Sequence, residues 1–185
     1  YTIVSQTRGP ELGYSETSGV RILNIDGFAF KDLDKDGELD IYEDWRRPVS
    51  ERAEDLAAQL PIERICGLML YSSAVDAMTA ELTTKQAGYL KDDYIRHMLV
   101  RNIADAATGA AWSNKVQAFC EAEPFGIPSN NSSDPRNYTN GQANTNTYQP
   151  EPDGEFDPDG TSKISLWPRE VGMAATLDPM IARRH

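Results

Sequence analysis

Cysteine and positive charge are both scarce in this sequence. Cys66 and Cys120 are the 2 cysteines among 185 residues, too few for the disulfide framework of a small secreted module. Both have apolar neighbours, which favours buried free thiols, with a single disulfide as the alternative. Lys and Arg number 18 against 29 Asp and Glu, which gives a net charge of −11. Because such a surface repels phosphate, we expect no nucleic-acid partner; cations and neutral ligands remain.

Long hydrophobic runs are also missing. No stretch approaches the roughly 20 apolar residues of a membrane-spanning helix, and no basic-then-apolar leader is present, so we expect no membrane span. The sequence starts at Tyr1 and not at methionine, which indicates a processed or excised product and favours a secreted or periplasmic location. With 39% hydrophobic and 25% charged positions, the 185 residues are enough for one sizeable core.

Acidic residues are abundant, and one group of them is regularly spaced. Residues 31–45 have the sequence KDLDKDGELDIYEDW. Acidic side chains occupy positions one, three, five, seven, nine and twelve of a possible loop, namely Asp32, Asp34, Asp36, Glu38, Asp40 and Glu43. Gly37 occupies position six, where an EF-hand calcium loop has glycine for its sharp turn. The spacing therefore predicts a calcium loop, with a solvated acidic turn as the alternative.

The expected ligands follow from the chemistry of calcium. This hard cation takes six to eight oxygen ligands, and alternate residues of a tightly curled loop point inward. We expect one structural Ca²⁺ bound by the side chains of Asp32, Asp34, Asp36 and Glu43. Glu38 would contribute its backbone carbonyl, and Asp40 would bind directly or through water.

The segment before the loop is unsuited to the first helix of an EF-hand. Residues 20–30, VRILNIDGFAF, are rich in β-branched side chains and interrupted by Gly27. The sequence contains no second copy of the loop, which counts against a paired calcium sensor. We expect a structural clip that holds an amino-terminal arm, residues 1–47, on the domain formed by residues 48–185.

The remainder of the chain alternates helical and extended patterns. Apolar positions at helical spacing predict helices over residues 48–60, 61–70 and 110–122, and β-branched residues predict a strand over 95–103. Residues 125–134, FGIPSNNSSD, predict a short strand that leads into a polar loop. This order predicts an α/β fold with a parallel sheet and helices outside it.

Three segments are informative when they are taken together. They are FKDLDKDGELDIYEDWRRPVSERAEDLAAQLPIERICGLML, AWSNKVQAFCEAEPFGIPSNNSSDPRN and ISLWPREVGMAATLDPM. In this order they resemble the beginning of glycoside hydrolase family 3 enzymes of the β-glucosidase type, over roughly residues 28–182. The resemblance implies the amino-terminal portion of a (β/α)8 TIM-type barrel, about half of a domain that needs ~250 residues when complete.

The resemblance also implies a reaction. Retaining glycosidases use two carboxyl groups about 5 to 5.5 Å apart, one as nucleophile and the other as acid and base. In the family the nucleophile lies late in the barrel and the acid/base is usually supplied from outside it. We therefore expect the leading segment of a retaining, exo-acting β-glycosidase with no catalytic residue in this segment. Its partners would be a carbohydrate substrate and the remainder of the same polypeptide.

One substrate-binding position follows from the resemblance. In the family the strand ending in GIP leads to an acidic residue that binds hydroxyls of the terminal sugar, and GIPSNNSSDPRN places Asp134 there. The alternative is an Asp-Pro turn. Arg136 would orient Asp134 or be solvated, and Trp167 would stack on a sugar ring or pack at the head of a helix. Asn137 departs from the histidine that is common in the family, which leaves the detailed loop shape open.

A second hypothesis comes from a different class of protein. The calcium loop is also compatible with a self-contained calcium-dependent binding or structural module. Such a module should end where its core closes, whereas the last residues, DPMIARRH, lie within a helical pattern. This favours the glycosidase hypothesis, in which the sugar and the linkage stay open.

Overall fold

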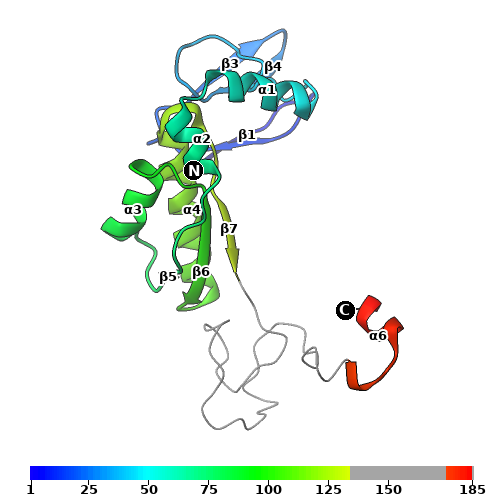
Figure 1. Cartoon of the computed structure of the whole chain (residues 1–185). Helices are drawn as coiled ribbons and strands as arrows, with labels where there is room; N and C mark the ends of the chain where they lie inside the picture. Colours follow the sequence, from blue (N-terminus) through cyan, green and yellow to red (C-terminus); the bar gives the residue numbers. More distant parts are fainter. Residues whose placement is uncertain (134–173, 185) are drawn as a thin grey trace.

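The computed structural model describes residues 1–133 and 174–184 (Figure 1). Its strands are β1 (Thr2–Val4), β2 (Leu12–Tyr14), β3 (Arg21–Ile25), β4 (Phe28–Asp32), β5 (Val75–Ala77), β6 (His97–Ile103) and β7 (Asn130–Ser133). Its helices are α1 (Val49–Gln59), α2 (Ile62–Leu68), α3 (Thr84–Lys91), α4 (Ala106–Ala122), the short 3-10 helix η1 (Pro124–Gly126) and α6 (Pro179–Arg184). Within the described ranges, no helix has the length and apolar character to span a membrane.

The amino-terminal arm contains two antiparallel strand pairs, β1 with β2 and β3 with β4. Asp26 and Gly27 connect β3 to β4 with φ angles of 53° and 80°. Two successive residues at positive φ are typical of the tight turns of β-hairpins, which favour Asp-Gly. The expectation that this segment does not form the first helix of an EF-hand is confirmed.

Aromatic rings hold the residues after the loop against this hairpin. The Trp45 ring stacks on Phe30 with a centroid distance of 5.5 Å and meets the edge of Phe28 at 5.7 Å. Its Nε1 donates to the Ala29 carbonyl at 2.9 Å. The acidic loop therefore begins and ends on the same hairpin. The expected domain boundary after residue 47 stays a prediction.

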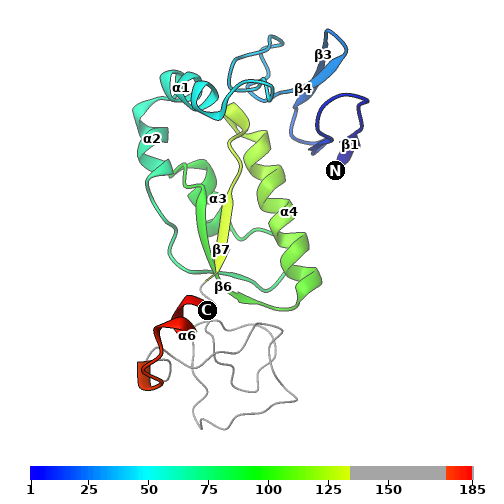
Figure 2. The ribbon, with the colours of Figure 1, turned by 90° about the vertical axis from the view of Figure 1, so that its right-hand side faces the viewer.

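The second part of the chain is built on a parallel sheet with the order β5-β6-β7. Met98 and Val100 of β6 are buried, and their side chains join Trp112 and Val116 of α4 in the core. Figure 2 shows α4 running alongside β6 and β7. The parallel α/β sheet is confirmed, as are the predicted helices α1, α2 and α4 and the predicted strand β6.

Two features of this part differ from the sequence-based expectation. The strand expected within residues 125–134 forms only on the polar residues of β7, since Phe125 and Gly126 lie in η1, where Phe125 has a φ of 69°. Strand β7 is defined by its pairing with β6, in which His97 lies opposite Asn130. Strand β5 and helix α3 were not predicted, although Thr83 and Gln86 form a capping box at the start of α3.

Both cysteines are free thiols, as the sequence favoured. Cys120 lies in the core, and burial raises the pKa of its thiol to about 11. The expectation of burial is wrong for Cys66, which is exposed. Helix α2, which contains Cys66, buries only Gly67, so its apolar positions do not lie in this core.

Gly67 lies where α2 closely approaches the backbone of a later loop. A Cβ there would lie 2.5 Å from the Asp93 carbonyl oxygen and 2.7 Å from the Tyr94 Cβ. Neither atom ends a flexible side chain, so Gly67→Ala should lower the free energy of unfolding by about 1 to 3 kcal/mol, despite the better helix propensity of alanine. Chemical denaturation measures this. The matched control is Gly88→Ala in α3, where the nearest atom is 3.7 Å away; equal effects of both variants would contradict the prediction.

Candidate functional site

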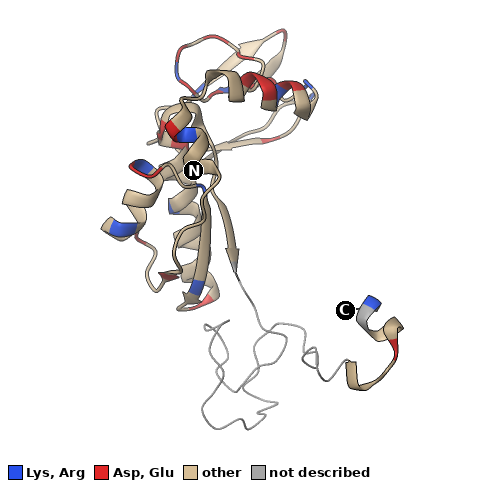
Figure 3. Cartoon of the chain, in the orientation of Figure 1, with Lys and Arg blue, Asp and Glu red and all other residues tan. Residues whose placement is uncertain are grey.

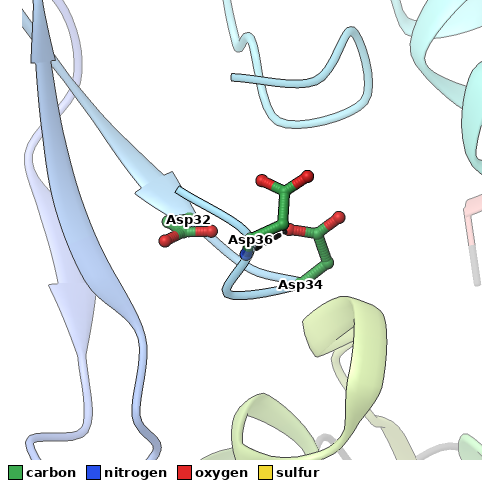
Figure 4. Close-up of side chains that lie close together, drawn as sticks. All are labelled: Asp32, Asp34 and Asp36. Atoms are coloured by element: carbon green, nitrogen blue, oxygen red, sulfur yellow. Dashed lines mark hydrogen bonds between the residues drawn. The ribbon is translucent and has the colours of Figure 1, made fainter. Parts of the chain in front are cut away.

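The acidic loop starts at Asp32, the last residue of β4 (Figure 4). One carboxylate oxygen from each of Asp32, Asp34 and Asp36 lies within 4.8 Å of the others. Oxygens on opposite sides of a Ca²⁺ are about 4.6 to 5.2 Å apart, twice the usual ligand distance of 2.3 to 2.6 Å. The three carboxylates are therefore close enough together to contact one such ion.

Three backbone N–H groups of the loop donate to aspartate carboxylates within it. Asp36 N–H donates to Asp34 Oδ1 at 3.2 Å, and Glu38 N–H donates to Asp36 Oδ1 at 2.7 Å. Gly37 has a φ of 90° and donates to Asp32 Oδ1 at 3.4 Å. The positive φ of Gly37 is a conformation that glycine adopts at no steric cost.

Glu43, at position twelve, closes the loop through the backbone. Its Oε1 accepts from the N–H groups of Leu33 at 2.5 Å and Asp34 at 3.3 Å, and its Oε2 accepts from Asp40 at 3.3 Å. The carboxylate is buried. Burial raises the pKa of Glu43, and the three N–H bonds oppose that rise. The Glu43 carboxylate is thus hydrogen-bonded to backbone N–H groups near both ends of the loop.

The two remaining predicted positions face elsewhere. The Glu38 side chain is exposed. Asp40 Oδ2 accepts from Gln59 Nε2 of α1 at 3.2 Å, so the loop is also joined to that helix. Figure 3 shows several acidic positions on α1 beside this part of the chain.

Negative charge is concentrated at the loop. Burial raises the pKa of Asp34, a hydrogen bond from the Asp36 backbone opposes this, and the neighbouring charges of Asp36, Asp40 and Asp32 raise the pKa further. Arg21 offsets part of the charge, since its Nη2 lies 2.8 Å from Asp32 Oδ2. A divalent cation would relieve the repulsion that remains.

Two lysines bind the arm to the end of α4. Lys35 Nζ, from the loop itself, lies 3.2 to 3.3 Å from the backbone carbonyls of Glu121, Ala122 and Glu123. Carbonyls at the end of a helix lack partners within the helix and bear partial negative charge, so a lysine there is favourable. Lys31 forms an ion pair with the Glu121 carboxylate. The sequence pattern did not predict either contact.

The predicted substrate-binding residues Asp134, Arg136 and Trp167 lie outside the described residues. Strands β5, β6 and β7 pair in parallel, so their carboxyl ends lie at the same edge of the sheet. Strand β7 ends there at Ser133. In parallel α/β sheets, ligands bind outside this edge. The sheet therefore has a defined edge at which a site can be built.

Comparison with known proteins shows which proteins this chain is similar to. No protein-family model matches it. The periplasmic β-glucosidase/β-xylosidase of Dickeya chrysanthemi is 32% identical over 176 residues, which cover 91% of this chain and 25% of that protein. Probable β-glucosidases C of Aspergillus flavus and Aspergillus oryzae are each 25% identical, over 157 and 151 residues, which cover 81% and 78% of the chain.

The chain spans about a quarter of the length of these relatives, at 25%, 23% and 22%. The similarity confirms the resemblance predicted from the motifs: over nearly its whole length, the chain is similar to part of a β-glucosidase-type glycoside hydrolase. The alternative of a self-contained calcium module gains no support from these relatives.

Proposed function

We propose that this chain is the amino-terminal segment of a retaining, exo-acting β-glycosidase that removes terminal sugars from β-glycosides or oligosaccharides. The observation that carries the proposal is the similarity of 91% of the chain to a periplasmic β-glucosidase/β-xylosidase. The name of that relative also supports a secreted or periplasmic location.

The proposed fold is the first part of a (β/α)8 barrel. The order β5-α3-β6-α4-β7 supports it, because parallel strands alternate here with helices, as barrel units do. Retaining hydrolysis needs a nucleophile and an acid/base about 5 to 5.5 Å apart, and we place both outside this chain. Within it, Asp134, Arg136 and Trp167 are the proposed substrate-binding residues, and all three follow β7 in the sequence.

The acidic loop is proposed to hold a structural Ca²⁺. The spacing of the Asp32, Asp34 and Asp36 carboxylates supports this. Glu43, Asp40 and the Glu38 carbonyl would complete the shell. When bound, the ion would supply positive charge that cancels the repulsion among these groups. The loop residues themselves hold the arm to α4 through Lys35, so the proposed role of the site is to stabilise that junction.

The proposed activity is testable on the full-length polypeptide with aryl β-glucosides and β-xylosides, followed by NMR of the released sugar. We expect the β-anomer to be released first, because two successive displacements retain the configuration. Residues 1–185 alone should release no sugar, since both catalytic carboxyl groups are placed outside them. Full-length protein that is inactive on every β-glycoside, or that releases the α-anomer first, would contradict the proposal.

A further inference from the structure

A polar cluster that the motifs did not reveal lies at the carboxyl ends of β5 and β6. Asn102 Nδ2 donates to Asp76 Oδ1 at 2.7 Å, and Arg101 Nε lies 3.8 Å from the same oxygen. We propose that Asp76, positioned by Arg101 and Asn102, accepts hydrogen bonds from hydroxyl groups of the sugar in the substrate site. This inference rests on the proposed glycosidase function and adds a substrate-binding residue to it.

The burial pattern of β5 shows which way Asp76 points. Its neighbours Val75 and Ala77 are both buried in the core between the sheet and the helices. Successive side chains of a strand point to opposite faces, so Asp76 points away from that core. Its side chain is 42% exposed. Asp76 therefore lies on the face of the sheet opposite the core that it forms with the described helices, near the edge where α/β proteins bind their ligands.

An irregularity in the pairing brings the cluster together. Val75 lies opposite Val100, but the next residue, Asp76, lies opposite Asn102, so Arg101 is an extra residue in β6. Such bulges redirect side chains and are common at barrel rims and next to active sites. Here the bulge places two consecutive side chains of β6 beside one carboxylate of β5.

The Asp76 carboxylate is contacted through one of its two oxygens, and the backbone of Asp76 is held by a separate hydrogen bond. Both described contacts of the Asp76 carboxylate use Oδ1, and within residues 1–133 and 174–184 the structure shows no donor to Oδ2. The Asp76 carbonyl accepts from Nε2 of the buried Gln86 at 2.8 Å, and Gln86 Oε1 accepts from Trp112 Nε1 at 3.3 Å. A fixed carboxylate with an open oxygen is suited to bind a hydroxyl by a charge-assisted hydrogen bond.

The charges of the cluster indicate a neutral ligand. Asp76 and Arg101 have opposite charges and lie close together, so the pair has no net charge to attract an ionic group. It offers an acceptor next to donors, and a sugar hydroxyl both donates and accepts. A neutral sugar with adjacent hydroxyls matches this combination.

The test is Asp76→Asn in the full-length enzyme, assayed on an aryl β-glucoside. The amide keeps the size of the side chain but loses the charge, so kcat/KM should fall about 10- to 100-fold while the melting temperature stays unchanged. Glu51→Gln is the matched control, because it neutralises an exposed carboxylate in the Arg47–Glu51 ion pair at the start of α1. This variant should keep the wild-type kcat/KM.

A set of monodeoxy β-glucosides separates binding from a structural role. If Asp76 binds one hydroxyl, the substrate that lacks it should be much poorer than the parent glucoside for wild type, but nearly as good as the parent for Asp76→Asn. Asn102→Ala should show the same substrate pattern with a smaller loss. A uniform loss on all substrates, or unchanged kinetics in an active enzyme, would overturn the inference and leave the proposed function standing. An inactive wild type would contradict the proposed function itself, and this inference with it.

Discussion

Removal of the proposed Ca²⁺ with a chelator should lower the melting temperature of this protein by roughly 10 °C. An ion that binds only the folded state stabilises it by about 4.1 kcal/mol at a concentration of 1,000 times its Kd, and each kcal/mol shifts the melting temperature by about 2 to 4 °C for a chain of this size. The stabilisation would come from relief of the repulsion among Asp32, Asp34 and Asp36, whose oxygens lie within 4.8 Å of one another. Differential scanning calorimetry with EDTA and with added Ca²⁺ measures the shift.

Metal selectivity and one pair of variants make this prediction specific. Mg²⁺ should restore little of the stability, because it demands a smaller octahedral shell. Asp36→Asn should reduce the Ca²⁺-dependent shift, because it removes a charged ligand from the loop. Asp26→Asn is the matched control, since Asp26 is an exposed aspartate in the β3–β4 turn, where asparagine tolerates the positive φ of 53°. A melting temperature indifferent to chelator would contradict a calcium site.

The contacts of Lys35 indicate which other parts of the protein calcium binding would stabilise. Lys35 lies in the loop, and its Nζ contacts the carbonyl of Glu121, which is 86 residues away in the sequence. Because α4 covers the sheet through Trp112 and Val116, loosening the loop should weaken the end of the helix that supports β6 and β7. The expected effect of calcium is therefore on the stability of the sheet, with little direct effect on the chemistry.

The features that could be predicted from the sequence depend on local patterns. The Asp34, Asp36 and Gly37 positions follow from the spacing of a loop that curls on itself. Helices α1 and α4 follow from apolar residues at helical spacing, and the absence of a helix over residues 20–30 follows from their β-branched side chains and Gly27. In each case the residues that determine the structure are close together in the chain, so the sequence alone contains the signal.

The features that could not be predicted depend on contacts between distant residues. Strand β5 is three residues long, too short for a periodic pattern, and it is defined by its pairing with β6. The cluster around Asp76 depends on a register shift in that same pairing, which no motif encodes. Strand β7 is polar, so its pairing with β6 and not its hydrophobicity sets its position. The Lys35 contact with α4 could not be predicted either, because it joins residues that are 86 positions apart in the sequence.

Replacing Asp134 with alanine should reduce kcat/KM of the full-length enzyme on an aryl β-glycoside by about 100-fold or more. If the carboxylate accepts bonds from two hydroxyls of the terminal sugar, each charge-assisted bond contributes about 1.5 to 3 kcal/mol, and each 1.4 kcal/mol corresponds to a factor of ten. The protein should keep its melting temperature. Asp134→Asn should keep part of the activity, because an amide can still accept one hydrogen bond and donate another.

The alternative role of Asp134, an Asp-Pro turn, predicts the opposite pattern: a lower melting temperature with nearly unchanged kinetics. Asp157 provides the matched control. It also precedes a proline, but unlike Asp134 it does not lie within a few residues of the GIP segment. Asp157→Ala should leave kcat/KM unchanged. A stable and fully active Asp134→Ala enzyme would remove Asp134 from the substrate site. Equal falls in melting temperature in the Asp134→Ala and Asp157→Ala variants, with kcat/KM nearly unchanged, would assign both residues to Asp-Pro turns.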